Sequence, residues 1–429
     1  MNVTTQRVPF WEAFRFWVKL GFISFGGPTG QIAIMHSELV EKKQWISESR
    51  FLHALNYCMF LPGPEAQQLA IYVGWLLHRT IGGIVAGAFF VIPSIFILWT
   101  LSFIYVQYGN VFWIASIFYG LKGAVTAIVA AAVIRIGRRA LKNEVMWLIA
   151  AAAFVAIFFF KIPFPFIILS AALIGFAGGK LLPQKFLVIE EEKSAIDNLH
   201  DAAEHTRPSL KRSIKVLVIC LLIWWIPVML IASWLGWNHT ITREGIFFSK
   251  AAMITFGGAY AVLPYVAQEA EKYQWIQTGQ MIDGLGLAET TPGPLIMVTM
   301  FVGFLGAWNL PGDLPRLLSA TLGSLITVWT TFVPCFLWIF LGAPYIEQLR
   351  GNKNLTASLS AVTAAVVGVI LNLAVWFGLH TMIPTKGTVD WFLLSLSIAC
   401  FVAMHRWKVD IIPVVLISAI LGLIYKMVV

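Results

Sequence analysis

Long apolar segments separated by short polar stretches cover almost the whole chain, from Trp11 to Val429. A helix that crosses the hydrocarbon core of a bilayer needs about 20 mostly apolar residues. By this criterion the sequence predicts an all-α integral membrane protein with about thirteen transmembrane segments. Six are expected near residues 10–35, 50–78, 81–108, 113–138, 145–160 and 163–182, and seven near 215–237, 244–268, 278–307, 316–343, 355–383, 389–405 and 410–428.

The longest polar stretch, which contains the acidic run 190–192, separates these two groups of segments. It predicts four parts of the chain: an N-terminal half (1–182), a polar cytoplasmic linker (183–214), a linking transmembrane helix (215–242) and a C-terminal half (243–429).

The two halves carry the same motifs in the same order, which indicates an internal repeat. Lys19, four residues and Ser24-Phe25-Gly26-Gly27 match Lys250, four residues and Thr255-Phe256-Gly257-Gly258 at an offset of 231. Further matches pair Gln44-Trp45-Ile46 with Gln274-Trp275-Ile276, and Pro62-Gly63-Pro64 with Pro292-Gly293-Pro294. Because seven segments separate equivalent positions, the second copy is expected to be inverted in the membrane. One segment more or fewer would make the copies parallel.

The composition supports a membrane protein: 59% of the residues are hydrophobic and 12% are charged, against about 25% charged in soluble domains. The formal charge of +9 does not indicate a nucleic-acid partner, because Lys and Arg occur in short clusters between apolar segments. Their distribution predicts a cytoplasmic N-terminus and an external C-terminus. Lys42, Lys43 and Arg50 disagree with this orientation, since the segment count places their loop outside.

Glycines and prolines interrupt four of the apolar segments at repeat-equivalent places. Glycine can end a helix and proline suits the first turn of a new one, so each motif predicts one half-helix ending and another beginning. A helix N-terminus offers free N–H groups and a positive dipole end to an anion. A single such motif would more simply be a kink, but four at equivalent positions favour a binding site between inverted repeats, as in many secondary transporters.

The predicted substrate-binding residues lie in or beside these motifs. They are Lys19, Ser24, Gly26, Gly27, Pro28, Thr29, Gln31, Pro62, Gly63, Pro64, Gln67 and Gln68 in the first half, and Lys250, Thr255, Gly257, Gly258, Thr290, Thr291, Pro292, Gly293 and Pro294 in the second.

Two further pairs of charged residues have two interpretations each. Lys19 and Lys250 precede the glycines by about two helical turns and could reach them, or could extend to the membrane surface. Glu65 and Glu289 flank the Pro-Gly-Pro motifs and are proton-coupling candidates, or could stabilise a helix terminus or pair with a lysine. Glu38 and Glu269 are interpreted as partners in structural ion pairs.

Together these motifs resemble the chromate ion transporter family in its long, two-domain form. The resemblance rests on both Phe-Gly-Gly motifs, Gln-Trp-Ile, Pro-Gly-Pro-Glu-Ala-Gln-Gln at 62–68 and the run 365–374, and it covers nearly the whole chain. It implies a bacterial inner-membrane protein that exports chromate. The second half has Gly257-Gly258-Ala259 where the first has Gly26-Gly27-Pro28, so the two copies of the site need not be equivalent.

Several alternatives stay open at this point. Sulfate is a tetrahedral dianion of similar size, so an importer or exchanger of sulfate-like oxyanions is the second hypothesis, and a channel is a third. The eight histidines are scattered and the sequence has no nucleotide-binding Gly-x4-Gly-Lys-Ser/Thr motif, so we predict no enzyme, metal or cofactor. The expected partners are the oxyanion and the lipid bilayer, and a homodimer is an open possibility.

Overall fold

The computed structural model describes residues 8–25, 27–186, 208–345, 353–383 and 388–428, and these residues fold into helices without a β-strand. The helices before the linker are α1 (Phe10–Ile23), α2 (Gly27–His36), η1 (Ser37–Lys42), α3 (Glu48–Phe60), α4 (Glu65–Phe89), α5 (Ile92–Tyr108), α6 (Phe112–Ala140), α7 (Glu144–Phe158), α8 (Phe164–Leu181) and α9 (Pro183–Phe186). Those after it are α10 (Leu210–Leu235), α11 (Thr240–Ile254), α12 (Ala259–Lys272), α13 (Gln280–Thr290), η4 (Leu295–Met297), α14 (Val298–Asn309), α15 (Arg316–Gly342), η5 (Ala343–Tyr345), α17 (Lys353–Met382), α18 (Trp391–Arg406) and α19 (Ile411–Val428). The prediction of an all-α protein is confirmed.

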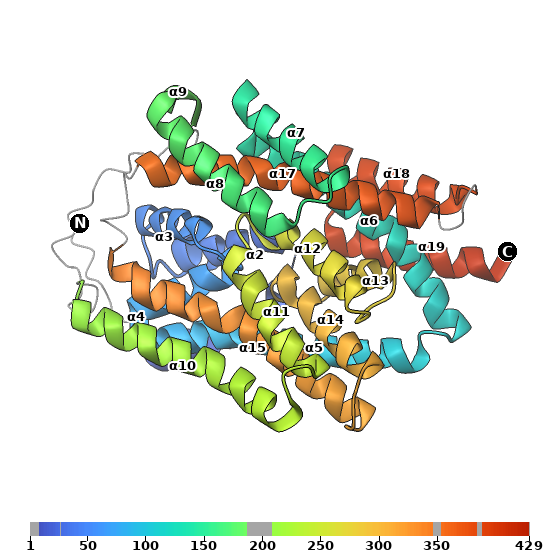
Figure 1. The fold of residues 1–429 in the computed structure, drawn as a ribbon, viewed down its shortest axis with the longest axis horizontal. Coiled ribbons are helices and arrows are strands. Elements are labelled where there is room, and N and C mark those ends of the chain that lie inside the picture. The colour runs from blue at the N-terminus through green and yellow to red at the C-terminus, as the bar shows by residue number, and fades with distance from the viewer. Residues whose placement is uncertain (1–7, 26, 187–207, 346–352, 384–387, 429) are drawn as a thin grey trace.

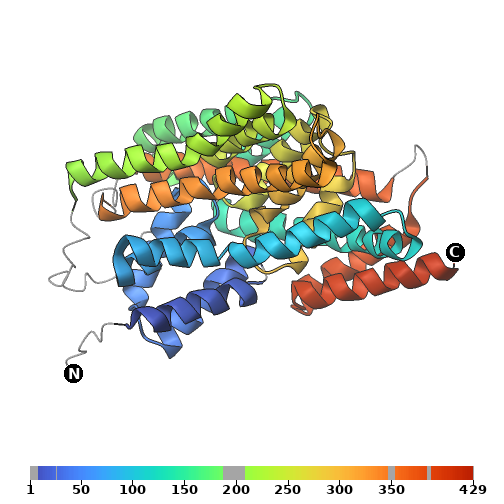
Figure 2. The same ribbon diagram turned by 90° about the horizontal axis from the view of Figure 1, so that it is seen from below.

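Seven helical stretches in the described ranges are long and apolar enough to cross a membrane. They are Glu65–Tyr108, Phe112–Ala140, Phe164–Leu181, Leu210–Leu235, Arg316–Tyr345, Thr356–Met382 and Ile411–Val428. Figure 2 shows α10 and α15 side by side along the length of the molecule. In Figure 1, α10 begins near one extremity of the long axis and α19 ends at the other. Most of the predicted linker, residues 187–207, lies outside the described residues.

The first predicted segment, 10–35, is not one continuous helix, because the chain reverses between α1 and α2. Lys43 follows η1 and its Nζ lies 3.3 Å from an oxygen of Glu12, in the first turn of α1. The Trp45 ring packs against Phe16 with ring centroids 5.4 Å apart. The basic loop that disagreed with the predicted orientation therefore lies beside the beginning of α1, where the Lys/Arg rule expects it. The orientation itself stays a prediction.

The chain reverses again at the Pro-Gly-Pro motif between α3 and α4, and a third time inside α4. The first part of α4 ends at His78, whose Nε2 lies 2.8 Å from the Val8 carbonyl oxygen. His78 and Arg79 have non-helical backbone angles, and the remainder of α4 continues towards α5. A Cβ atom on Gly74 would lie 2.4 Å from the Gly82 carbonyl oxygen, so two parts of α4 pack backbone to backbone.

The second half has the same succession of reversals. Phe247 of α11 stacks edge-on against Trp275, which follows α12. Asn309 at the end of α14 donates from Nδ2 to the Trp275 carbonyl oxygen at 2.9 Å. The helices α13 and α14 with η4 therefore correspond to α3 and the first part of α4. The number of segments and the inverted repeat stay predictions.

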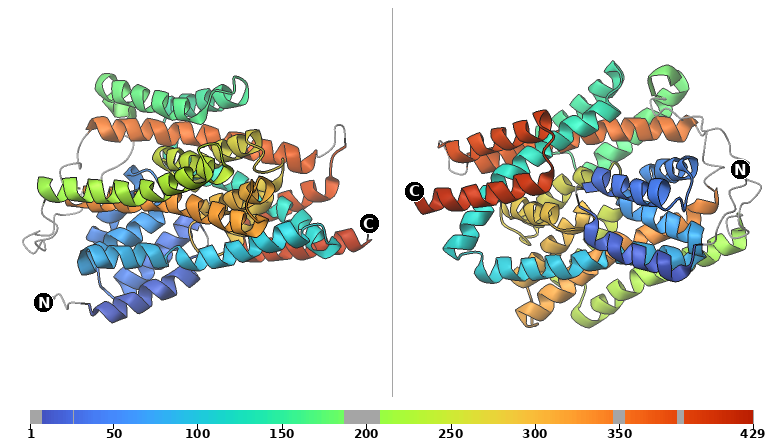
Figure 3. Two further views of the ribbon diagram at one scale, coloured as in Figure 1. Left: turned by 60° about the horizontal axis from the view of Figure 1, so that its bottom comes forward. Right: turned by 180° about the vertical axis from the view of Figure 1, so that it is seen from behind.

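The long helices α6 and α17 each pack against a hairpin from the other half. In Figure 3, α7 and α8 lie along α17, and α18 and α19 lie along α6. Small residues bring these helices close: a Cβ atom on Gly120 would lie 2.0 Å from the Ser418 carbonyl oxygen. On Gly175 it would lie 2.5 Å from the Ala357 carbonyl oxygen. Close approach at small residues is the usual packing of helices in membranes.

Candidate functional site

Two backbone hydrogen bonds join the motifs of the first half to those of the second. The Gly63 N–H donates to the Thr255 carbonyl oxygen at 2.8 Å, and the Gly293 N–H donates to the Ser24 carbonyl oxygen at 2.8 Å. Each bond connects the Pro-Gly-Pro loop of one half to the end of the helix before Phe-Gly-Gly in the other. The four helix interruptions that the sequence predicted therefore meet at one place.

The hydroxyl groups of Ser24 and Thr255 donate hydrogen bonds to the last turns of their own helices. Ser24 Oγ donates to the Leu20 carbonyl oxygen at 2.6 Å, and Thr255 Oγ1 donates to the Ala251 carbonyl oxygen at 2.6 Å. Bonds from a serine or threonine to the carbonyl four residues earlier satisfy the hydroxyl locally. It is thus the backbone of these two residues, rather than their hydroxyl groups, that links the halves.

Side chains reinforce the same junction. Gln31 Nε2 donates to the Gly293 carbonyl oxygen at 2.6 Å, across the halves, and to the Ser24 carbonyl oxygen at 3.3 Å. Ser94 Oγ donates to the Pro292 carbonyl oxygen through a short hydrogen bond. Gln68 Nε2 instead donates to the Pro62 carbonyl oxygen of its own loop at 2.8 Å.

Glycine is required at the centre of both Pro-Gly-Pro loops. Gly63 has φ +122° and Gly293 has φ +104°, in the region that only glycine adopts readily. A Cβ atom would lie 1.8 Å from Ser94 Oγ at Gly293, and 2.9 Å from Cys335 Sγ at Gly63. Both positions combine an unusual backbone with close contact to the opposite half.

Helix N-termini surround the junction, as the glycine and proline positions predicted. The helices α2, α4 and α12 begin at Gly27, Glu65 and Ala259, and η4 follows Pro294. The first N–H groups of a helix have no acceptor within that helix. Glu65 Oε1 lies 3.7 Å from the position that a Cβ atom of Gly258 would take, so this carboxylate lies beside the beginning of α12.

The acid of the second half has its own set of partners. Tyr260, in the first turn of α12, donates a short hydrogen bond to Glu289 Oε1, and both side chains are buried. The positive charge of Arg135 on α6 acts on both groups, and that of Arg139, one turn later, acts on Glu65. One helix thus supplies a basic residue to each of the two acids.

Three other predicted site residues form hydrogen bonds within their own half of the chain. Thr290 and Thr291 donate to carbonyl groups of α13, and Gln67 Nε2 donates to the Gly87 carbonyl oxygen at 3.3 Å. Gly26 lies outside the described residues, as does the side chain of Thr29. Lys19 and Lys250 have exposed side chains, and their place in the anion site stays a prediction.

Lys19 belongs to a surface network with Glu38, as expected for a structural ion pair. The Lys19 ammonium lies 4.0 Å from Glu38 Oε1, and Lys42 donates to the same oxygen at 2.9 Å. The hydrogen bond from Lys42 holds the pKa of the Glu38 carboxyl below its ordinary value. Glu269 likewise pairs with Lys272 at 3.3 Å. The structural role expected for both glutamates is confirmed.

A polar cavity of about 620 Å³ lies at the other end of α6. Among its lining residues, Tyr105 donates to Asp283 Oδ2 at 2.9 Å, and Lys122 Nζ lies 3.7 Å from Asp283 Oδ1. Tyr119 and Lys426 also line it, with the Lys426 ammonium over the Tyr119 ring. Arg139 and this cavity therefore lie at opposite ends of α6.

Sequence reasoning missed Arg135, Arg139 and Tyr260. The two arginines were counted as basic loop residues, although their spacing of four places them on one helix face. Tyr260 is the counterpart of Thr29 at the offset of 231, and this pairing was the available signal. In the described ranges, no three His, Cys, Asp or Glu side chains are grouped so that they could hold a metal ion.

The chain is similar in sequence to proteins that are named as transporters. A chromate transport protein of Pseudomonas aeruginosa is 28% identical over 98% of this chain and 94% of its own length. One of Cupriavidus metallidurans is 26% identical over 95% of this chain and 91% of its own, and an uncharacterized transporter of Methanocaldococcus jannaschii is 25% identical over 95% and 92%. No solved structure matches the chain. The model of the chromate transporter family matches residues 11–176 and 244–423, and the chain therefore belongs to the chromate transporter family.

Proposed function

We propose that this protein is a secondary active transporter that exports chromate across the bacterial inner membrane, and that the anion binds at the junction of the four helix interruptions. The names of the relatives favour chromate as the substrate. No cofactor is needed for this function. The observation that carries the proposal is the pair of backbone hydrogen bonds from Gly63 to Thr255 and from Gly293 to Ser24.

Two physical properties of the junction suit a tetrahedral dianion. Helix N-termini provide unpaired N–H donors and the positive end of a dipole, without the fixed charge that would retain the anion. The arginines on α6 add long-range attraction, while Glu65 and Glu289 limit the net positive charge. Such a site would bind sulfate-like oxyanions as well, because it recognises charge and oxygen atoms rather than the central element.

The halves also offer a route to alternating access. We interpret the two halves as inverted repeats, so that the junction lies near the midplane and the same loops face both sides in turn. Arg139 then lies on the cytoplasmic approach, and the cavity with Lys122 and Asp283 on the external one. Rocking of one half against the other would open one approach while closing the other.

The test is chromate uptake into inverted membrane vesicles that contain the protein, with sulfate as competitor. Uptake driven by an imposed proton gradient or membrane potential, above that of vesicles without the protein, supports export. Gly258→Ala, at φ +90° beside Glu65, should abolish uptake, whereas the matched control Gly378→Ala should not, because nothing lies within 4 Å of a Cβ there.

Two other results would decide for the alternatives. Sulfate uptake without chromate uptake would replace chromate as the substrate and leave the binding site in place. Loss of uptake in Lys250→Ala, with normal uptake in Gly258→Ala, would move the site from the junction to the lysines.

A further inference from the structure

The acid at position 244 is buried without a partner, far along α11 from the proposed anion site. Glu244 is fully buried, and among the described residues neither of its carboxylate oxygens has a hydrogen-bond partner. It lies near the beginning of α11, whereas Thr255, which accepts the hydrogen bond from Gly63, follows the end of that helix. Its counterpart in the first half, at the offset of 231, is Ala13, so only the second half carries this acid.

Two glycines form the walls around this carboxyl group. A Cβ atom on Gly306 of α14 would lie 2.4 Å from Glu244 Oε1, and one on Gly323 of α15 would lie 2.7 Å from Oε2. Each carboxylate oxygen therefore lies against a glycine, where a larger side chain would collide with it. A proton needs no additional volume.

The elements packed around Glu244 present neutral atoms to it. Gly306 of α14 and Gly323 of α15 approach its two oxygens, and the Trp275 side chain, Ala307 and the Gly303 carbonyl oxygen lie near these two glycine positions. Within the described ranges no charged group acts on Glu244. Arg243 on the same helix is exposed and donates to Asn238 at 3.1 Å. An ionised carboxylate without a partner is costly in such surroundings, so the neutral, protonated form fits this conformation.

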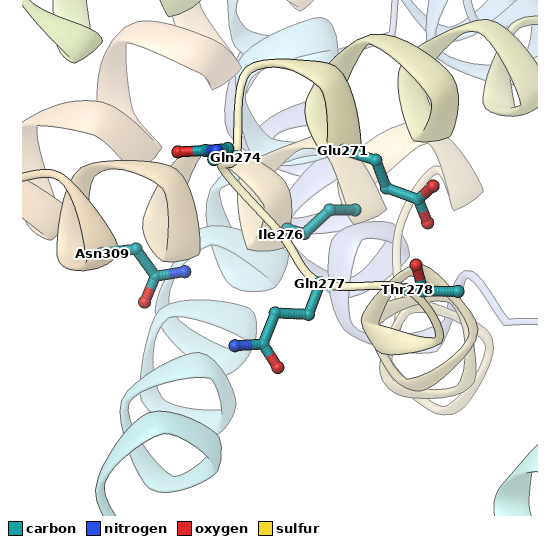
Figure 4. A pocket seen from close by; sticks show the side chains of 6 residues that line it. All are labelled: Glu271, Gln274, Ile276, Gln277, Thr278 and Asn309. Carbon is teal, nitrogen blue, oxygen red and sulfur yellow. The ribbon is translucent and has the colours of Figure 1, made fainter.

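A surface pocket is lined by the residues on either side of Trp275 in the sequence. It has a volume of about 540 Å³ and is lined by Glu271, Gln274, Ile276, Gln277, Thr278 and Asn309 (Figure 4). The buried Trp275 lies between Gln274 and Ile276, and its Cβ lies 2.9 Å from the same Gly306 position that Glu244 approaches. Burial raises the pKa of the Glu271 carboxyl, which lines the pocket. Trp275 thus lies near the Gly306 position that Glu244 approaches, and its two neighbours in the sequence line a pocket that contains a second carboxyl group.

We propose that Glu244 is the coupling-proton site of the transporter, and that it exchanges its proton with the pocket lined by Glu271 when Trp275 moves. This inference rests on the proposed function, because a coupling proton has meaning only if an anion is transported. The proton would bind one carboxylate oxygen when the site is closed and leave it when water enters. Since α11 joins Glu244 to Thr255, the state of the carboxyl group can influence the anion site.

The experiment compares the wild-type protein with Glu244→Gln in proteoliposomes, using two assays. Counterflow of labelled chromate measures exchange without a driving gradient, and accumulation under an imposed pH gradient measures coupling. Glu244→Gln should lose all pH-driven accumulation and retain counterflow, because the amide replaces the neutral carboxyl group without taking a proton. Glu269→Gln, which changes a partly exposed acid of α12 that pairs with Lys272, should retain both activities.

Each outcome has a separate meaning. Absence of counterflow in the wild-type protein would refute the proposed function, whereas normal accumulation in Glu244→Gln would refute only the coupling role. Accumulation that follows a sodium gradient rather than a pH gradient would also refute it.

A measurement on the wild-type protein avoids dependence on a variant that does not fold. A hydrophobic carbodiimide should modify Glu244, detected by mass spectrometry, with a rate that falls as the pH rises. A rate that does not fall as the pH rises would contradict a protonated carboxyl group, and absence of modification at acid pH would contradict the proposed access through movement of Trp275.

Discussion

The Pro-Gly-Pro loops of the two halves have the same backbone contacts but different side chains around them. In both loops the central glycine has positive φ and donates to the carbonyl group at the end of α1 or α11. Ser94 contacts the second loop where Cys335 contacts the first, both after a proline in their helices. Glu65 follows the first loop, but Leu295 follows the second. The two loops therefore share their backbone contacts, whereas the acid beside the first loop has no equivalent beside the second.

The largest difference in transport is expected between the two variants in which alanine replaces the central glycine of one loop. Gly293→Ala should abolish transport, because its Cβ would collide with Ser94 Oγ, which is held by a bond to Pro292. Gly63→Ala should lose less transport, because its Cβ would lie 2.8 Å from Gln68 Nε2 and 2.9 Å from Cys335 Sγ, farther than the 1.8 Å at Gly293. Overpacking costs about 1–3 kcal/mol in addition to the backbone strain. Counterflow rates and size-exclusion profiles of both variants measure this, and equal losses would contradict the asymmetry.

The second comparison concerns the two arginines of α6. Arg135→Gln is expected to lower the rate about tenfold, or about 1.4 kcal/mol, because it removes the positive charge that acts on the buried pair of Tyr260 and Glu289. Arg139→Gln should have a smaller effect, because Arg139 is exposed and solvent screens its charge. Initial rates of chromate uptake at several salt concentrations compare the two. A larger effect at Arg139 would show that the first acid dominates.

Gln31 and Gln68 allow a bond between the halves to be compared with a bond within one loop. Gln31→Leu removes a hydrogen bond between the halves and is expected to lower the midpoint of thermal unfolding, by a cost of about 1–3 kcal/mol. Gln68→Leu removes a bond within one loop and should lower it less. Thermal unfolding of the purified protein, followed by intrinsic fluorescence, provides the measurement. Equal shifts of the two midpoints would mean that the hydrogen bond between the halves stabilises the protein no more than the bond within one loop.

The smallest effect on the free energy of unfolding is expected at the surface ion pair of Glu38, which is not part of the junction. Its pKa is lowered in the folded state, so its stabilisation is present at neutral pH and lost as the pH falls below about 4. Lys42→Ala should therefore cost about 0.3–0.5 kcal/mol at pH 7 and less at an acid pH at which the Glu38 carboxyl is protonated in the folded state. Unfolding midpoints at the two pH values test this, and an equal loss at both would exclude the ion pair as the cause.

The helix interruptions could be predicted from the sequence, because glycine and proline restrict the backbone locally. Positive φ at Gly63, Gly257, Gly258 and Gly293 follows from the residue type and needs no distant partner. The repeat showed that these positions come in equivalent pairs. Both predictions depend on short stretches of chain, which is why a single sequence was sufficient.

The features that the sequence did not predict depend on contacts between residues that are distant in the chain. Nothing near Lys43 in the sequence indicates that it reaches Glu12, so the reversal between α1 and α2 could not be derived from apolar length. Arg135 is near the end of a helix in the sequence, and only tertiary packing places it beside Glu289. Glu244 looked like one acid among others, because its burial is created by glycines on two other helices.

The exchanged hairpins around α6 and α17 have a consequence for how the protein is made. If residues 1–182 were synthesised alone, the face of α6 at Gly120 would lack α19, and the face of α8 at Gly175 would lack α17. Each half is therefore expected to be an incomplete product, degraded when expressed singly and rescued when both are produced in the same cell. Biogenesis would finish only after α19 emerges from the ribosome, so quality control must tolerate an unfinished first half during synthesis of the second.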